Sequence, residues 1–186
     1  MSALLAGCLS RSDSLAPIIS ITNPKDGATR TTENLIISGY ALDDEGIAAI
    51  RVNGHDLLTN ETYQGEQGNK LIFFRFQSQV LGEGTLNSMI EAEDVSGRVS
   101  QLPYSLQIDT TAPTLELTVL PLSGGRLRVE GVARDNNTVA SVQVGEVSLQ
   151  FIPSGEYPFA LDIETTGSDV VVVRDSAGNE TVRSLQ

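Results

Sequence analysis

Short runs in which apolar and polar positions alternate recur along almost the whole chain. In one of them Ile72, Phe74 and Phe76 occupy every second position. A period of two places successive side chains on opposite faces of a β-strand, so each such run predicts a strand with one buried face. The run Val170–Val173 is apolar throughout and predicts a strand that is buried on both faces. No long stretch combines helical periodicity with capping residues, so the pattern predicts an all-β chain.

The predicted strands fall into two sets of about seven, which is the number typical of an immunoglobulin-like sandwich. The first set lies near residues 17–22, 34–42, 47–52, 55–58, 70–77, 85–93 and 98–108. The second set lies near residues 114–120, 126–134, 139–144, 146–151, 157–162, 168–174 and 179–185. The turns between them have suitable residues. Asn53-Gly54 favours a tight hairpin, and in residues 94–97 and 175–178 an aspartate can cap backbone N–H groups before a left-handed glycine.

The sequence also repeats itself at a constant offset. The matching pairs are Gly39 with Gly131, Ala41 with Ala133, Asp43 with Asp135, and Val52 with Val144. Each copy opens on Ala-Pro, at residues 16–17 and 112–113. A repeat of roughly 75–95 residues is far longer than a solenoid unit and is long enough for a domain. We therefore expect two tandem β-sandwich domains, the first over residues 17–109 and the second over residues 110–186.

Five short phrases are typical of one kind of module. They are Asn-Pro-Lys-Asp-Gly at 23–27, Ser-Gly-Tyr-Ala-Leu-Asp at 38–43, Val-Asn-Gly at 52–54, Asp-Thr-Thr-Ala-Pro at 109–113 and Asp-Ser-Ala-Gly-Asn at 175–179. In these phrases residues 17–186 resemble bacterial immunoglobulin-like modules of the Big and glucodextranase types. The resemblance implies two tandem immunoglobulin-like sandwiches. It implies little about function, because such modules serve many roles.

The only cysteine, Cys8, ends the tetrapeptide Leu-Ala-Gly-Cys at residues 5–8. This tetrapeptide resembles the lipobox of bacterial lipoproteins, in which the cysteine is acylated and becomes the first residue of the mature chain. The resemblance makes residues 1–8 a truncated signal peptide and residues 9–16 a tether. A complete signal peptide has a basic region and a longer apolar segment than these residues provide. The alternative is a terminal tail with an incidental thiol.

Leu9, and not an aspartate, follows the cysteine. In lipoproteins that resemble this one, that pattern accompanies export to the outer membrane. We therefore expect lipid attachment at Cys8 and a location at the bacterial outer membrane, on its periplasmic or its cell-surface side. A single cysteine excludes a disulfide within the chain.

The charge of the chain argues against a nucleic-acid partner. There are 24 acidic and 12 basic residues, which give a formal net charge of −12, and no cluster of lysine or arginine offsets the acidic excess. A phosphate backbone would be repelled by such a chain. We expect no nucleic-acid partner.

Motifs for catalysis are missing from the sequence. The single histidine, His55, follows the Asn53-Gly54 turn, where a solvated role is far more common than a catalytic one. There is no Gly-x-Ser-x-Gly nucleophile elbow, no Cys/His metal motif and no glycine-rich phosphate loop before a helix. We therefore predict no catalytic residue, no cofactor, no bound metal and no small-molecule substrate.

Carbohydrate binding is the main alternative to a protein-interaction role. Sugar platforms usually present coplanar aromatic rings, yet this chain has no tryptophan and its four tyrosines are scattered. We expect Phe73, Phe74 and Phe76 to lie in the core. The leading hypothesis is thus a non-catalytic envelope lipoprotein that acts as a structural or protein-interaction subunit with an envelope complex or a surface partner. A carbohydrate-binding or adhesion module is the alternative.

Three aspartates raise a separate hypothesis. In an immunoglobulin-type sandwich the B–C and F–G loops lie at the same end, and in the second domain these loops carry Asp135 and Asp175. The linker that enters this domain carries Asp109, so the three carboxylates are expected to converge. Carboxylates and loop carbonyls are the ligands of Ca²⁺. The alternative, which the sequence favours, is that these aspartates only cap turns.

Overall fold

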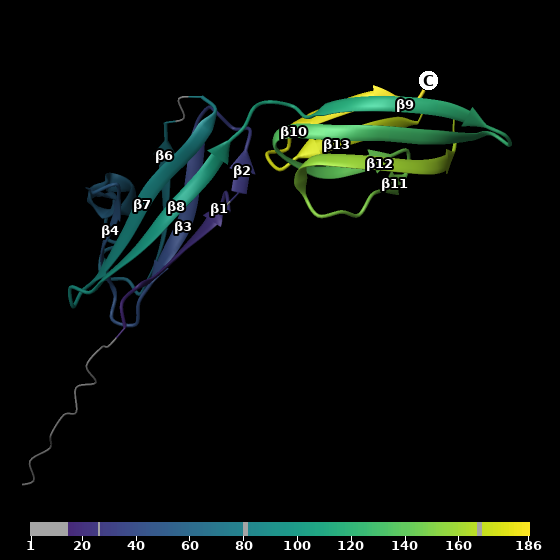
Figure 1. Ribbon diagram of the computed structural model, residues 1–186. Helices are drawn as coiled ribbons and strands as arrows, with labels where there is room; N and C mark the ends of the chain where they lie inside the picture. Colours follow the sequence, from purple (N-terminus) through teal and green to yellow (C-terminus); the bar gives the residue numbers. More distant parts are fainter. Residues whose placement is uncertain (1–14, 26, 80–81, 167–168) are drawn as a thin grey trace, which may run out of the picture. The chain divides into compact units, whose positions relative to one another are not determined.

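The computed structural model describes residues 15–25, 27–79, 82–166 and 169–186. The predicted signal peptide, the lipid attachment expected at Cys8 and most of the predicted tether (residues 9–16) lie outside these residues. The chain is nearly all-β with sandwich-like sheets, which confirms the predicted fold class (Figure 1). Two 3₁₀ helices, Leu57–Thr59 and Glu61–Tyr63, interrupt the strands. In the part of the chain described, no helix has the length and apolar character needed to cross a membrane.

The chain divides into two compact units. The first takes the described residues up to Lys25, together with Ile36–Ser78 and Asn87–Tyr104. The second takes Asp26–Leu35, Gln79–Leu86 and Ser105–Gln186. The domain limits expected from the sequence, 17–109 and 110–186, stay a prediction.

The strands of the first half form a three-stranded and a five-stranded sheet. The smaller sheet has the order β1 (Ile18–Asn23), β3 (Leu35–Leu42), β6 (Leu71–Ser78). The larger has the order β2 (Gly27–Thr29), β8 (Val99–Ile108), β7 (Gly84–Asp94), β4 (Ile47–Val52), β5 (His55–Asp56). β2 was not predicted, because three residues are too few to show a period. Alternate residues of both sheets are fully buried, among them Ile37, Ile50, Ile72 and Ile90.

The strands of the second half are joined through one long strand. They are β9 (Thr114–Leu122), β10 (Arg126–Val144), β11 (Val147–Ser148), β12 (Ser154–Glu164), β13 (Val170–Asp175) and β14 (Glu180–Ser184). The first part of β10 pairs mainly with β9 and β12, and its last part pairs with β11 and β13. The register shifts between Arg134 and Val139. One strand therefore runs where the sequence predicted two, and an irregular bulge over residues 135–138, the bulge of β10, lies where the prediction placed a loop.

The glycine that recurs in both copies has the same physical role in each. A Cβ at Gly39 would lie 2.4 Å from the carbonyl oxygen of Ser20 and 2.8 Å from Cζ of Phe74. At Gly131 it would lie 2.6 Å from Cζ of Phe159. In both copies a phenylalanine ring packs directly on the strand backbone, and only glycine leaves room for it.

One part of the predicted core is wrong. Phe73 is 68% exposed, whereas Phe74 is buried and Phe76 is partly buried. The reason is the period of two along β6, which turns Ile72 and Phe74 inward and Phe73 outward. The Phe73 ring therefore lies on the surface of the three-stranded sheet rather than in its core.

Candidate functional site

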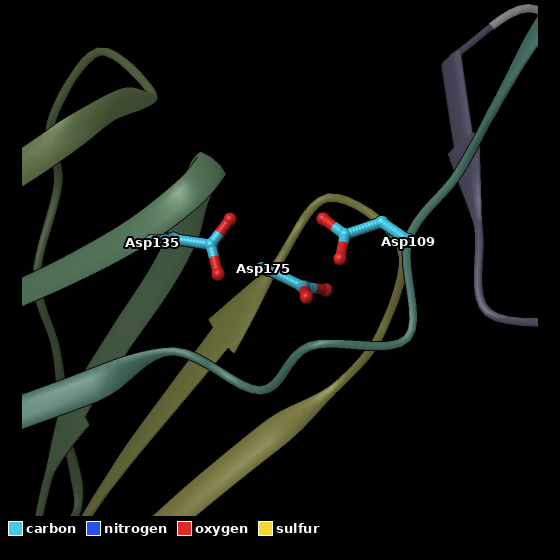
Figure 2. A group of neighbouring side chains, drawn as sticks. All are labelled: Asp109, Asp135 and Asp175. Carbon is cyan, nitrogen blue, oxygen red and sulfur yellow. The ribbon is translucent and has the colours of Figure 1, made fainter. Parts of the chain in front are cut away.

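The three aspartates that the sequence analysis singled out lie together in the structure (Figure 2). Asp109 follows β8, Asp135 lies in the bulge of β10, and Asp175 is the last residue of β13. One carboxylate oxygen from each lies within 4.8 Å of those from the other two. All three residues belong to the second compact unit. Asp109 and Asp175 are buried, at 1% and 3% exposure, and Asp135 is half-buried.

One oxygen of Asp135 and one of Asp109 hold the local backbone. Oδ1 of Asp135 accepts hydrogen bonds from the N–H groups of Asn137 (2.9 Å) and Thr138 (2.7 Å). Oδ1 of Asp109 accepts the N–H of Thr111 (3.0 Å) and Nδ2 of Asn136 (3.4 Å). The second oxygen, Oδ2, of each of these two aspartates is buried and has no hydrogen-bond partner among the described residues.

The third carboxylate is held by Asn179. Oδ1 of Asp175 accepts the N–H of Asn179 (2.8 Å), and Oδ2 accepts its side-chain Nδ2 (2.7 Å). The same Nδ2 donates to the carbonyl oxygens of Asp109 (2.9 Å) and Thr111 (3.3 Å). A single buried amide therefore connects the turn after β13 with the segment that carries Asp109.

Glu83 holds that segment from its other side. Its Oε1 accepts the N–H and the hydroxyl of Thr110 (3.1 and 2.6 Å) and the hydroxyl of Thr111 (2.7 Å). These hydrogen bonds, the one from the Thr110 hydroxyl first, lower the pKa of Glu83 below its usual value. The backbone from Asp109 to Thr111 is thus held by side-chain contacts from Glu83 and Asn179.

No basic side chain in the described part of the chain forms an ion pair with any of the three aspartates. The arginine next to Asp135 in sequence, Arg134, pairs with Glu116 and Glu156. The arginine next to Asp175, Arg174, pairs with Glu180. The three carboxylates therefore face one another without a compensating charge from these neighbours.

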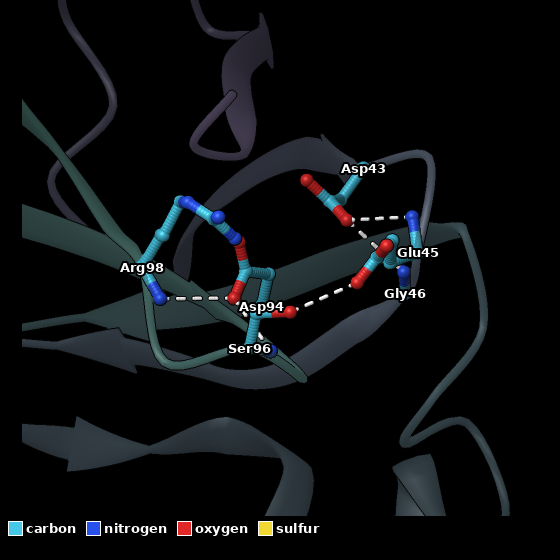
Figure 3. A network of polar contacts seen from close by, with 6 residues as sticks. All are labelled: Asp43, Glu45, Gly46, Asp94, Ser96 and Arg98. Carbon is cyan, nitrogen blue, oxygen red and sulfur yellow. Dashed lines mark hydrogen bonds and ion pairs between the residues drawn. The ribbon is translucent and has the colours of Figure 1, made fainter. Parts of the chain in front are cut away.

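The first unit contains a similar pair of loops with different chemistry (Figure 3). Oδ1 of Asp43 accepts the N–H groups of Glu45 (2.8 Å) and Gly46 (3.0 Å), the residues two and three positions after it. Oδ1 of Asp135 accepts the N–H groups at the same two positions after Asp135. Oδ1 of Asp94 accepts the N–H groups of Ser96 (2.7 Å) and Arg98 (2.9 Å). The guanidinium of Arg98 lies 3.7 Å from Oδ2 of Asp94. Here the chain supplies its own cation.

A second feature of the first unit is an apolar surface on the outer side of the three-stranded sheet. Ile18, Leu42, Leu71 and Phe73 are between 41% and 68% exposed, and Tyr40 is half-buried. Ile18 pairs with Leu42 across β1 and β3. The rings of Tyr40 and Phe73 meet edge to face at 6.2 Å. We call these five residues the apolar face.

The groove beside the lone histidine offers no catalytic grouping. His55 and Asp56 line it together with Tyr63 and Arg75. The hydroxyl of Tyr63 donates to the carbonyl oxygen of Arg75 (2.9 Å) and accepts its N–H (2.8 Å). The Tyr63 side chain therefore holds the backbone of β6. Within the described ranges, no nucleophile in this groove is paired with a base.

Comparison with known proteins supports the fold. No known family and no curated protein matches the sequence. Among solved structures, the chain is similar to the fibronectin(III)-like modules of CbhA from Clostridium thermocellum, with a TM-score of 0.58, 15% identity, and coverage of 90% of this chain and 91% of that one. Fibronectin type III modules share the immunoglobulin-like sandwich architecture.

Two further structures are less similar. One is dimeric latent PorU from Porphyromonas gingivalis, with a TM-score of 0.42, 13% identity, and coverage of 96% of this chain and 20% of that one. The other is SGBP-B of the mixed-linkage glucan utilization locus of Bacteroides ovatus, solved with a mixed-linkage heptasaccharide. It has a TM-score of 0.31, 16% identity, and coverage of 92% of this chain and 46% of that one. Likeness at this level does not bear on the function of the chain.

Proposed function

We propose that this chain is a non-catalytic lipoprotein of the bacterial envelope that acts as a structural or protein-interaction subunit. Cys8 carries the lipid that attaches it to the outer membrane. The apolar face is the surface that contacts the partner, which is another protein of the envelope. The one observation on which this proposal depends is the exposure of the apolar face.

The composition of the apolar face fits a protein partner. Single exposed apolar residues are common on protein surfaces, but a contiguous group that includes aromatic rings is typical of the centre of an interface. The backbone N–H of Asp43 donates to the carbonyl oxygen of Lys70 (2.8 Å), which places Leu42 beside Leu71. The row Ile18, Leu42, Leu71 thus crosses all three strands, next to the pair Tyr40 and Phe73.

The ends of the same sheet add a second mode of contact. β1 and β6 are its two edge strands. An edge strand presents unpaired N–H and C=O groups to which a strand of another protein can add. A partner that adds a strand at β6 would lie beside Leu71 and Phe73, so edge and face form one continuous surface.

The test isolates the acylated full-length protein from native membranes after crosslinking and compares variants of the apolar face. Phe73→Ser and Leu71→Ser are expected to reduce the recovered partner at least tenfold. Val99→Ser is the matched control, because Val99 is as exposed as Leu71 (46% and 43%) but lies on β8. All three changes are expected to alter stability by less than about 0.5 kcal/mol. If the partner is recovered equally with Leu71→Ser, Phe73→Ser and Val99→Ser, the apolar face is not the interface.

The anchor is tested separately. Growth with an alkyne-labelled fatty acid is expected to label the wild-type protein and not Cys8→Ser. Fractionation is expected to place the labelled protein in the outer membrane. Label that persists in Cys8→Ser would remove the lipid anchor from the proposal while leaving the role of the apolar face open to the crosslinking test.

The aromatic residues speak against the alternative of a sugar platform. The rings of Tyr40 and Phe73 are inclined at 63° and so are not coplanar. Phe151 and Tyr157 are parallel within 12°, but they stack on each other at 3.8 Å. Tyr63 and Tyr104 are buried. A glycan array probed with the full chain is expected to give no signal, and a signal lost in Tyr40→Ala would favour the carbohydrate-binding alternative.

A further inference from the structure

We propose that Asp109, Asp135 and Asp175 form a Ca²⁺ site in the second unit. This inference concerns a different part of the molecule from the apolar face and does not depend on the function proposed for that face. It rests on three observations: the spacing of the three carboxylates, the burial of two oxygens without a partner, and the loops that orient them.

The spacing fits one shared ion. Ca²⁺ binds oxygen ligands at about 2.4 Å, so two ligands of one ion are at most about 4.8 Å apart, when they lie on opposite sides of it. One oxygen of each of the three aspartates satisfies this limit with the other two. Among the residues that the structure describes, no other three acidic, histidine or cysteine side chains meet this closely.

The two buried Oδ2 atoms of Asp109 and Asp135 indicate that a cation is needed between the carboxylates. Asp109 is 1% exposed, and its Oδ2 has no hydrogen-bond partner within the described residues; the same holds for Oδ2 of Asp135. A buried carboxylate oxygen without a partner loses its hydration and gains nothing in return. Turn capping alone does not account for this arrangement, because in Asp109 and Asp135 it uses only Oδ1. A cation between the three side chains would compensate both orphan oxygens at once.

The loops orient the carboxylates before any ion binds. Hydrogen bonds to Oδ1 of Asp135 and of Asp109 hold these side chains in place, and Figure 2 shows the three carboxylates gathered together. Asn179 holds Asp175 through both carboxylate oxygens, with its backbone N–H on Oδ1 and its side-chain amide on Oδ2. Ligands held in place by such contacts lose little conformational freedom on binding, which favours affinity.

The donor set selects a hard cation. All three ligands are carboxylates, and no histidine or cysteine joins them, which disfavours zinc and the other ions that prefer nitrogen or sulfur. Ca²⁺ accepts six to eight oxygen ligands in irregular geometry, and loop carbonyls, asparagine side chains and water can supply the remainder. Mg²⁺ demands a near-ideal octahedron and retains several waters, so we expect it to bind more weakly.

Binding would join three segments that are distant in sequence. These are the segment before β9, the bulge of β10 and the turn after β13. An ion that binds only the folded state stabilises it in proportion to the logarithm of its concentration above Kd. At about 100 times Kd, we expect the Tm of the second unit to rise by about 10–20 °C.

The first experiment is isothermal titration of the chelator-treated full chain with CaCl₂, with thermal unfolding followed in parallel. One ion per chain and the stated rise in Tm are the expected results. The absence of both heat and a Tm change at 10 mM CaCl₂ would overturn the proposal, and so would Mg²⁺ binding as tightly as Ca²⁺.

The second experiment compares isosteric variants. Asp109→Asn and Asp135→Asn are expected to weaken Ca²⁺ binding at least tenfold each. Asp43→Asn is the matched control, because Asp43 caps its loop as Asp135 does but belongs to the first unit. It should lower stability and leave Ca²⁺ affinity unchanged. If one site variant fails to fold by circular dichroism, the other is decisive alone. Wild-type affinity in a folded site variant, or an equal loss in Asp43→Asn, would overturn the assignment.

Discussion

The turn after β7 and the turn after β13 have the same backbone hydrogen-bond pattern but differ in the charge of one side chain. In each, the N–H of the aspartate donates to the carbonyl oxygen four residues later, at 3.0 Å for Asp94 and Arg98 and at 3.1 Å for Asp175 and Asn179. In each, a glycine with positive φ precedes that residue, Gly97 in the first. The first turn then places a guanidinium beside its buried carboxylate, and the second places a neutral amide there.

This difference bears on whether the buried carboxylate of each turn requires a bound cation. A buried carboxylate is stable only when its charge is compensated. Arg98 provides a compensating charge within the chain for the turn after β7. Asn179 provides hydrogen bonds but no charge, and Asp135 and Asp109 bring two more carboxylates to the same place. The residue after the glycine thus determines whether the buried carboxylate is neutralised by an arginine of the chain or by a bound Ca²⁺.

Exchanging that residue should have the largest effect. Asn179→Arg places a guanidinium beside Asp175, and we expect Ca²⁺ affinity to fall at least about 100-fold because the two cations compete for the same carboxylates. Titration calorimetry and the Tm difference between Ca²⁺ and chelator measure it. Asn179→Ala is the control: it should lose about 2–3 kcal/mol of stability through the missing hydrogen bonds and still gain Tm from Ca²⁺. A full Ca²⁺ response in Asn179→Arg would break the comparison.

The reverse exchange should be milder. Arg98→Asn removes the guanidinium from the buried carboxylate of Asp94, and we expect the free energy of unfolding to fall by about 1–2 kcal/mol, since the arginine itself is partly exposed. Urea unfolding measures the loss. Arg174→Asn, which breaks the more exposed pair with Glu180, is the control and should cost less than about 1 kcal/mol. Equal losses in the two variants would show that Arg98 has no special role.

Changing the glycines should have the smallest effect and should affect both turns alike. Gly97 has a φ of 84° and Gly178 a φ of 90°, and in both cases a Cβ would meet nothing within 4 Å. Alanine at either position should therefore cost only about 1 kcal/mol, the penalty of a left-handed conformation. Gly155→Ala, where φ is ordinary, is the control for urea unfolding. A loss that differs by more than about 1 kcal/mol between the two turns would mean that their backbones are not equivalent.

Much of the fold can be read from the alternation of apolar and polar residues. The predicted strand near 34–42 is β3, in which buried and more exposed residues alternate. The one near 47–52 is β4, in which the alternation breaks where the register shifts between Ile47 and Ala49. The same alternation places Phe73 on the exposed face of β6. The prediction that Phe73 lies in the core was wrong because it treated Phe73, Phe74 and Phe76 as one group. Had the period been followed through residue 73, the apolar face could have been found from the sequence.

The course of β10 and the unpaired carboxylate oxygens depend on distances between atoms, which the alternation of apolar and polar residues does not give. Asp135, Asn136 and Asn137 are typical turn residues, so a loop was predicted where β10 continues through a bulge with changed partners. The loop positions of an immunoglobulin-like sandwich were enough to predict that Asp109, Asp135 and Asp175 converge. The orphan state of two of their oxygens was not predictable, because it depends on which oxygen each backbone N–H selects.

The continuity of β10 has a mechanical consequence. Its 19 residues form one strand with two sets of partners, β9 and β12 mainly on one part and β11 and β13 on the other, with a shift of register between them. A pull that detaches β9 loads a strand that also carries the backbone pairing of β13. Strain introduced at one end of the second unit is thereby shared along the length of that strand.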